Sequence, residues 1–202
     1  MKVLVTGAAG FLGSHIVPQL VDEGLDVFCL DTAEGYAVGR LKGMERKVRF
    51  VTSDITQPSL QDAISEPVDT VIHLAAIAAP NLCDQNPPLA FALNVGGTHN
   101  VLKLALKCGA KKAIFSSTSH VYGISPKYLP TDERHPLWSQ DTYTVGKLLG
   151  EHLCQLYYDN HGLSYLTLRI YNGYGPGQST GYFIPDMIKK ALTGRIDLKG
   201  AD

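Results

Sequence analysis

The 202-residue sequence has no long apolar run and no excess of charge of one sign. No stretch reaches the roughly 18 apolar residues of a membrane span. The N-terminus also lacks a basic region followed by an apolar core, so nothing indicates a secretion signal. The formal net charge of −1 and the pI near 6.6 favour neither a nucleic-acid partner nor a membrane surface. We therefore expect a soluble, cytoplasmic protein.

Paired cysteines are also absent. The four cysteines are scattered, with no CxxC pair and no His/Cys cluster at metal-ligand spacing. This pattern excludes a disulfide scaffold and a zinc site, and it predicts buried, reduced thiols and no bound metal. Hydrophobic residues make up 45% of the chain, which is enough to bury one sizeable core.

A glycine-rich turn near the N-terminus dominates the sequence. Residues 2–6 form an apolar run typical of a buried strand, and residues 11–23 carry apolar side chains at helical spacing. Between them, Gly7 can adopt a turn conformation closed to other residues, Gly10 lets a ligand approach the backbone, and Gly13 lets the helix pack closely. The free N–H groups at the helix start suit a pyrophosphate. The pattern predicts dinucleotide binding, although an ordinary strand–helix turn is the alternative.

An acidic residue follows the second predicted strand, residues 26–30. The carboxylate of Asp31 can accept hydrogen bonds from an adenosine ribose and would repel a 2′-phosphate, which favours NAD over NADP. Two alternatives remain: Asp31 could merely begin a turn, and Arg40 could tolerate a 2′-phosphate.

The next two predicted strands add further candidate cofactor residues. Asp54 and Ile55 follow the strand at residues 48–52, where adenine would lie in a doubly wound sheet. The strand at residues 68–74 is followed by Ala75 and Ala76, which are small enough to let a cofactor pass. His73 has no acidic partner nearby in sequence, so we interpret it as structural rather than catalytic.

The rest of the chain continues to alternate between the two element types. We expect strands at residues 112–116 and 163–170, and helices at 60–64, 84–108, 141–160 and 184–192, with a loop over 124–140. Asn94 and the glycines at 96 and 97 interrupt the second of these helices. Strands alternating with helices over short connections predict a parallel α/β sheet.

Three side chains point to chemistry on a hydroxyl group. Tyr143 and Lys147 stand four residues apart at a helix start, so both can reach one site. A lysine ammonium would stabilise tyrosinate and make the phenol a usable base. Thr118 follows a strand, where its hydroxyl could hold a substrate alcohol. A Tyr-x-x-x-Lys spacing alone can also arise by chance.

The motifs TGAAGFLG, HLAA, NVGGT, SSTSHVYG, YTVGK and RIYNGYGPG, together with the aspartates at 31 and 54, occur in order along the whole chain. In this the sequence resembles the extended short-chain dehydrogenases/reductases of the nucleotide-sugar epimerase/dehydratase family. The resemblance implies a Rossmann-type doubly wound parallel sheet, bound NAD, and Thr118, Tyr143 and Lys147 as catalytic residues. It also implies a homodimer formed by the helices around residues 84–108 and 141–160.

The resemblance extends to two sets of binding residues. The cofactor residues it implies are Gly7, Gly10, Phe11, Leu12, Gly13, Asp31, Asp54, Ile55, Leu74, Ala75, Ala76, Asn94, Ser116, Tyr143 and Lys147. The substrate residues it implies are Thr118, Ser119, His120, Tyr143, Asn172, Tyr182 and Phe183. Residues 1–170 would form the NAD-binding domain, and residues 171–202 would begin a substrate-binding region that is truncated relative to the family.

Two departures from the family pattern bear on function. Dehydratases and decarboxylases of the family usually carry a glutamate two residues after the catalytic threonine, whereas His120 stands there. This counts against elimination chemistry, and we interpret His120 as packed beside the site rather than as a replacement acid. The chain is also shorter than family members, so either a C-terminal segment is missing or the protein is a reduced form.

The sequence therefore predicts an NAD-dependent epimerase acting at C4 of a UDP-hexose or UDP-hexuronate through a transient 4-keto intermediate. A dehydratase, decarboxylase or NAD(P)-dependent reductase of the same superfamily is the first alternative. The second is a non-catalytic dinucleotide sensor or scaffold.

Overall fold

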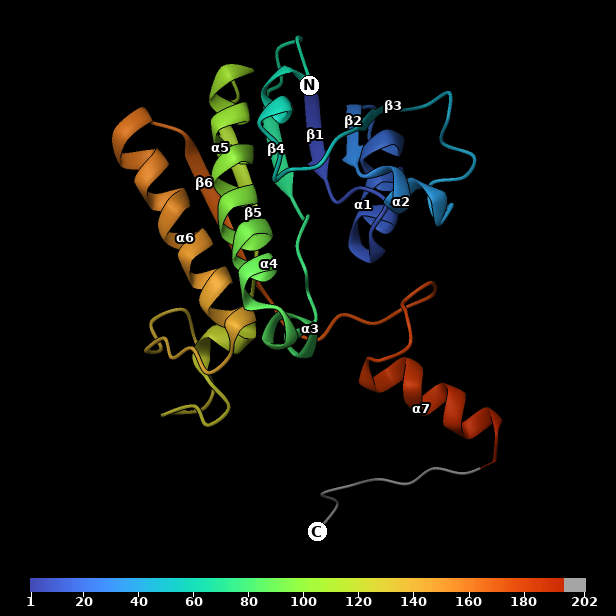
Figure 1. The fold of residues 1–202 in the computed structure, drawn as a ribbon, viewed down its shortest axis with the longest axis vertical. Helices are drawn as coiled ribbons and strands as arrows, with labels where there is room; N and C mark the ends of the chain where they lie inside the picture. Colours follow the sequence, from blue (N-terminus) through green and yellow to red (C-terminus); the bar gives the residue numbers. More distant parts are fainter. Residues whose placement is uncertain (195–202) are drawn as a thin grey trace. The chain divides into compact units, whose positions relative to one another are not determined.

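The structure is a computed structural model and describes residues 1–194 (Figure 1). Two compact units can be separated, Met1–Tyr171 and a second unit that begins at Asn172. The predicted boundary between a cofactor domain and a substrate-binding region stays a prediction. Within residues 1–194, no helix is both long and apolar enough to cross a membrane.

The first unit is built on one parallel sheet of six strands. These are β1 (Lys2–Thr6), β2 (Asp26–Asp31), β3 (Arg49–Thr52), β4 (Thr70–His73), β5 (Lys112–Thr118) and β6 (Ser164–Ile170), in the order β3-β2-β1-β4-β5-β6. Every neighbouring pair is parallel. The strand order reverses between β1 and β4, and ligands of doubly wound sheets bind outside the carboxyl ends of the strands at such a point. The predicted Rossmann-type sheet is confirmed.

Alternating side chains of β1 build two separate cores. Val3 and Val5 pack with Val17 of α1 (Phe11–Asp22) on one face. Leu4 belongs to the cluster on the other face, which includes residues of α5 (Thr98–Lys107) and α6 (Thr142–His161). Figure 1 shows α5 and α6 running side by side across the strands. Because successive side chains of a strand point to opposite faces, helices cover both sides of the sheet.

The helix predicted over residues 84–108 is not one continuous helix in the structure. The structure has α3 (Pro80–Gln85), α4 (Pro87–Phe91), the π-helical segment η2 (Ala92–Gly97) and then α5. Proline stands at the start of both α3 and α4, where its missing N–H and fixed φ are tolerated. The side chain of Asn86 caps α4 by accepting a hydrogen bond from Leu89 N.

Smaller elements differ from prediction by a few residues. The predicted helix at 60–64 is the 3₁₀ turn η1 (Pro58–Asp62), and β5 continues two residues beyond its predicted end, to Thr118. Two short elements, α2 (Ala33–Ala37) and η3 (Ser119–Tyr122), follow β2 and β5. The extension of β5 places Thr118 inside the strand's last hydrogen-bonded pair, opposite Ile170.

Helix α6 is fixed at both ends by its own sequence. The Asp141 side chain accepts a hydrogen bond from Thr144 N at 2.7 Å, and Gly162 ends the helix with a φ of +70°. Tyr143, Gly146, Lys147 and Gly150 are buried. The helix therefore presents its first two turns to the core with Tyr143 and Lys147 on the same side.

The second unit contains α7 (Phe183–Leu192). Tyr182 precedes its first turn, and the Asp186 side chain accepts a hydrogen bond from Gly181 N at 2.8 Å. None of the side chains of α7 is buried, so the helix carries its apolar residues on an open face.

Candidate active site

The glycine turn after β1 has the geometry that its sequence predicts. Gly7 has a φ of +67°, and a Cβ added there would lie 2.6 Å from the backbone nitrogen of Ala75. A Cβ at Gly13 would overlap the carbonyl oxygens of Gly7 and Ala8. Both glycines are therefore needed, the first for turn conformation and for the approach of β4, and the second for the packing of α1 on the turn.

A cavity of about 240 Å³ lies at the carboxyl ends of β1, β2 and β4. Eight of the predicted cofactor residues line it: Gly7, Gly10, Asp31, Asp54, Ile55, Leu74, Ala75 and Ala76. Sequence reasoning missed other lining residues, which are Ala9, Leu30, Thr32, Gly35, Ser53 and Leu93. The missed residues flank predicted ones, so widening each motif by one or two positions would have found most of them.

Asp31 links the glycine turn to the end of β2 at this cavity. One carboxylate oxygen accepts a hydrogen bond from Ala9 N at 2.8 Å, and the other accepts one from Thr32 N at 2.8 Å. A Cβ at Gly35 would overlap the same carboxylate, which explains a glycine in the second strand–helix turn. Arg40 also lines the cavity and donates to the carbonyl of Ala9 at 3.3 Å. The carboxylate is thus fixed in place at the end of β2, where a ribose hydroxyl could reach its remaining lone pairs.

Several predicted cofactor residues lie outside the cavity lining. Phe11 packs edge-on against His15, with 5.2 Å between ring centroids, and Leu12 and Gly13 belong to the first turn of α1. Asn94 is buried in η2, where its amide accepts a hydrogen bond from Ile77 N at 2.9 Å and donates to Ile77 O at 3.1 Å. The geometry assigns Asn94 to fixing the chain after β4.

Thr118, Tyr143 and Lys147 are buried together where β5 ends and α6 begins. The ammonium of Lys147 lies 5.9 Å from the centroid of the Tyr143 ring and donates a hydrogen bond to Ser116 O at 2.7 Å. The hydroxyl of Thr118 accepts a hydrogen bond from His120 N at 3.2 Å. The structure therefore brings the three predicted catalytic residues to one end of the sheet.

The burial of Lys147 changes its acid–base chemistry. Desolvation lowers the pKa of its ammonium to about 8, and the nearby thiol of Cys83 opposes this shift. The side chain also lies 5.1 Å from the centroid of the Phe115 ring, a cation–π contact that partly offsets the lost hydration. Lys147 is therefore a desolvated ammonium group beside the ring of Tyr143.

Ser119 and His120 line a second cavity, of about 360 Å³, whose other walls include Tyr122, Gln140 and Asp141. The His120 ring packs edge-on against Tyr143, with 6.2 Å between centroids. His120 therefore lies beside Tyr143, and its role stays a prediction. Asn172, Tyr182 and Phe183 belong to the second unit, and their substrate contacts stay predictions.

Sequence reasoning missed a part-buried ion pair near these residues. Glu151 and Arg169 approach to 2.8 Å with side chains 12% and 19% exposed, and the hydroxyl of Ser117 donates to Glu151 at 2.5 Å. Arg169 also donates to the hydroxyl of Tyr122 at 3.2 Å. The pair links α6, β5 and β6, and Ser117 stands next to Thr118 in β5. Glu151 lies one helical turn after Lys147, and this spacing could have indicated from the sequence that Glu151 faces the same side of the helix.

Comparison with known proteins decides the family. The model of the NAD dependent epimerase/dehydratase family matches residues 3–201. The chain belongs to this family. The resemblance inferred from the motifs is thereby confirmed, and the cofactor of the protein is NAD.

Individual relatives include more than one type of enzyme. A putative UDP-glucose 4-epimerase of Methanocaldococcus jannaschii is 38% identical over 178 residues, which is 87% of this chain and 57% of the relative. UDP-glucuronic acid decarboxylase 3 of Arabidopsis thaliana is 32% identical over 206 residues, 96% of this chain and 58% of the relative. The Thermus thermophilus UDP-glucose 4-epimerase, solved with NAD, has a TM-score of 0.85 and 32% identity, over 96% of this chain and 63% of that one. The chain thus spans less than two thirds of each.

The residues of the first cavity fit NAD. Gly7 and Gly10 line this cavity, and a Cβ at Gly10 would lie only 3.0 Å from Gly7 O, so the turn is tight. The turn stands at the start of α1, where free N–H groups suit a pyrophosphate. The carboxylate of Asp31 lies at the end of β2, where the adenosine ribose of a dinucleotide is bound in doubly wound sheets.

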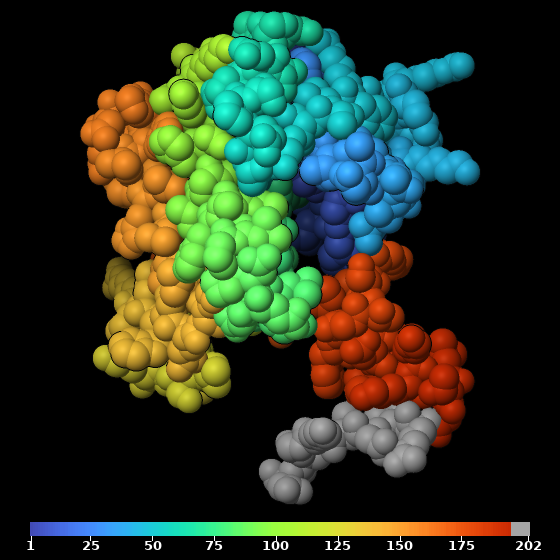
Figure 2. Space-filling view, in the orientation of Figure 1, coloured from blue at the N-terminus to red at the C-terminus, as the bar shows by residue number. Residues whose placement is uncertain are grey.

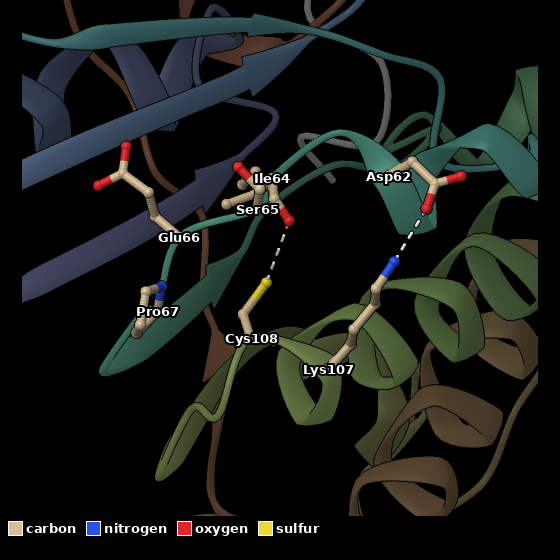
Figure 3. A pocket seen from close by; sticks show the side chains of 7 residues that line it. All are labelled: Asp62, Ile64, Ser65, Glu66, Pro67, Lys107 and Cys108. Carbon is tan, nitrogen blue, oxygen red and sulfur yellow. Dashed lines mark hydrogen bonds and ion pairs between the residues drawn. The ribbon is translucent and has the colours of Figure 1, made fainter.

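A further hollow of about 470 Å³ lies at the opposite end of the sheet, before β4 and β5 (Figure 3). Lys107 crosses it to Asp62 at 2.9 Å, and the thiol of Cys108 donates to Ile64 O at 3.7 Å. It is remote from the carboxyl ends of the strands, so we assign it no part in the site. Among residues 1–194, no three His, Cys, Asp or Glu side chains group as metal ligands would.

Proposed function

We propose that the protein is an NAD-dependent epimerase of a nucleotide sugar, acting at C4 of a UDP-hexose or UDP-hexuronate. The burial of Tyr143 and Lys147 on one side of α6, beside Thr118, carries the proposal. The named activities of the relatives support the substrate class.

Each of the three residues has a distinct task in this proposal. Tyr143 removes the proton of the C4 hydroxyl, Thr118 orients that hydroxyl, and Lys147 stabilises the tyrosinate. NAD, when bound, supplies the redox chemistry by accepting a hydride from the sugar and returning it to the other face. Tyr143 then returns its proton to the C4 oxygen of the 4-keto intermediate, so neither protons nor electrons are gained or lost overall.

The binding roles are proposed from the same site. The residues lining the first cavity hold NAD, while Phe11, Leu12, Gly13, Asn94 and Ser116 support it from behind the lining. Ser119, His120, Asn172, Tyr182 and Phe183 contact the nucleotide sugar. We propose a cytoplasmic location for the protein.

Dehydration and decarboxylation are the second candidate, because a decarboxylase is among the relatives. After oxidation at C4, elimination needs a carboxyl group that moves a proton at a neighbouring carbon. His120 stands where that glutamate is usual, and its ring packs on Tyr143. This arrangement favours epimerisation.

The proposal is tested by incubating the protein with NAD and either UDP-glucose or UDP-glucuronate, and by separating the sugar nucleotides chromatographically. Conversion to an isomer without net NADH absorbance is expected. Y143F should lower turnover at least ~100-fold, the usual range for a general base, while NAD affinity changes less than ~3-fold. Y158F, on the exposed side of the same helix, is the matched control and should retain full turnover. Full activity of Y143F would overturn the assignment of the base.

NADH accumulating in proportion to product would instead select net oxidation, and release of carbon dioxide would select decarboxylation. Binding of NAD without binding of any sugar nucleotide would favour a sensor or scaffold.

We also propose a homodimer through α6 and the helices between residues 80 and 107. Figure 2 shows these helices, orange and green, forming adjoining surface on one side. Several large apolar side chains on them are between 38% and 52% exposed: Leu82, Leu89, Phe91, Leu149 and Leu156. Burying such side chains between two copies would remove them from water. Sedimentation of the protein and of an L156E variant tests this, with a monomeric wild type contradicting it.

A further inference from the structure

The proposed function makes no use of His73, a buried imidazole at the end of β4. Only 3% of the residue is exposed. Its Nδ1 lies 2.6 Å from the hydroxyl of Thr6, the last residue of β1, and its Nε2 lies 3.0 Å from the hydroxyl of Thr98, the first residue of α5. The ring thus connects three elements that are distant in the sequence.

The directions of these hydrogen bonds follow from the neighbouring groups. The hydroxyl of Thr98 donates its hydrogen to Asn94 O at 2.7 Å, so it accepts from Nε2–H of His73. Nδ1 is then an acceptor, and the hydroxyl of Thr6 donates to it. The Thr6 oxygen in turn accepts from Ala75 N at 3.4 Å. One neutral tautomer satisfies every group, and burial, together with the Lys147 ammonium, lowers the pKa of His73 to about 3.

The two arms of this network end at two different parts of the wall of the NAD cavity. Thr6 directly precedes Gly7, and Gly7 and Ala75 approach so closely that a Cβ would not fit between them. On the other arm, Thr98 bonds to the backbone of η2, whose Leu93 lines the same cavity. Moving His73 therefore moves both walls.

We propose that His73 is a positioning residue for NAD. Through Thr6 it holds the glycine turn, and through Thr98 it holds η2, so that the two walls of the cavity keep the separation that the cofactor needs. A neutral imidazole suits this task because it presents one acceptor and one donor on different edges of a rigid ring. The His73 backbone carbonyl adds a third link by accepting a hydrogen bond from the hydroxyl of Ser116 at 2.9 Å.

The test is calorimetric titration of NAD into the full chain freed of nucleotide. H73F keeps a planar aromatic ring, slightly larger than imidazole, and removes both bonds. It should raise the Kd for NAD about 10-fold, since two net hydrogen bonds are at stake. H73N retains an acceptor for Thr6, and H73Q retains a donor for Thr98. Each should raise the Kd only about 3-fold, which is the partial rescue that one remaining bond gives.

V71A is the matched control for a purely structural effect. Val71 is buried in the same strand and truncating it lowers stability without touching the network, so its Kd for NAD should stay within about 2-fold of the wild type. A wild-type Kd for H73F would overturn the proposal. Equal Kd increases in H73F and V71A at equal loss of Tm would also overturn it.

T6V and T98V keep the test valid if H73F does not fold. Each removes one hydroxyl while preserving the side-chain shape, and each should raise the Kd for NAD about 3-fold. Unchanged affinity in both variants would overturn the proposal.

Discussion

The two halves of the sheet form their parts of the site in different ways. In the half formed by β1, β2 and β3, the cavity depends on backbone shape, because Gly7 and Gly13 leave no room for a Cβ against other backbone atoms. In the half formed by β4, β5 and β6, the site depends on buried polar side chains, notably His73 and Lys147. In the proposed function, the first half binds NAD beside the glycine turn, whereas the second supplies the proton-transfer residues from a buried site.

This difference predicts which changes each half tolerates. Backbone atoms of a turn cannot move without disturbing the elements on both sides, whereas a side chain can rotate or be replaced by one of similar shape. The first half should therefore be most sensitive to added Cβ atoms, and the second to the removal of single polar partners.

The largest effect is expected for an alanine at Gly13. G13A forces a Cβ against two carbonyl oxygens, and we expect it to lower the free energy of unfolding by at least ~4 kcal/mol. G150A places a Cβ against the Phe115 ring instead, and this overpacking should lower the free energy of unfolding by about 2 kcal/mol. G96A meets no atom within 4 Å and should be neutral or stabilising by up to ~1 kcal/mol. Urea denaturation measures all three.

The comparison depends on the order of the three stability losses, with G13A above G150A and G150A above G96A. If G150A proved as damaging as G13A, the distinction between backbone and side-chain neighbours would be broken.

A somewhat smaller effect is expected for the ion pair in the second half. R169M leaves Glu151 charged, part-buried and without its cation, which should lower the free energy of unfolding by about 2 kcal/mol. Replacing both partners, as in E151L/R169M, should recover most of that loss because no lone charge remains. R49M is the control: the side chains of Arg49 and of its partners Asp26 and Glu66 are 44%, 38% and 45% exposed, so less than about 1 kcal/mol should be lost. A double variant no more stable than R169M would contradict this account.

Local motifs predicted much of the site from the sequence. The glycine turn, Asp31 and the Tyr143–Lys147 spacing depend on residues close in sequence, and each lies where its motif places it. The proline signals at 80 and 87 were also present, although the helix was predicted to run through the second of them.

The networks that support the site could not be predicted in the same way. Thr6 and His73 are 67 residues apart, and Ser117 and Glu151 are 34 apart. Whether such residues meet depends on which strands pair and in which register, and a shift by one residue would turn each side chain to the other face. Asn94 illustrates a mixed case: its importance was predicted, but its bonds to Ile77 depend on η2.

A smaller change in stability than for the ion pair is expected for the buried lysine of the second half, where stability and chemistry can be separated. K147M removes a buried charge, so it should abolish turnover yet raise the free energy of unfolding at pH 7 by about 1–2 kcal/mol. The folded protein holds the pKa of Lys147 at about 8, below its ordinary 10.5, so its charged form opposes folding. The cost is complete below pH 8 and disappears as the pH rises toward 10.5, because the unfolded chain then binds more protons.

Urea denaturation of the NAD-free protein at pH 7 and at pH 10 checks this sign. The advantage of K147M over the wild type should be clear at pH 7 and nearly absent at pH 10. K103M removes an exposed lysine from the neighbouring helix α5 and should change stability by less than ~0.5 kcal/mol at either pH. If K147M were less stable than the wild type at pH 7, the bond from Lys147 to Ser116 O would outweigh the cost of burying the charge. The second half of the sheet would then be held together by the same residue that performs its chemistry.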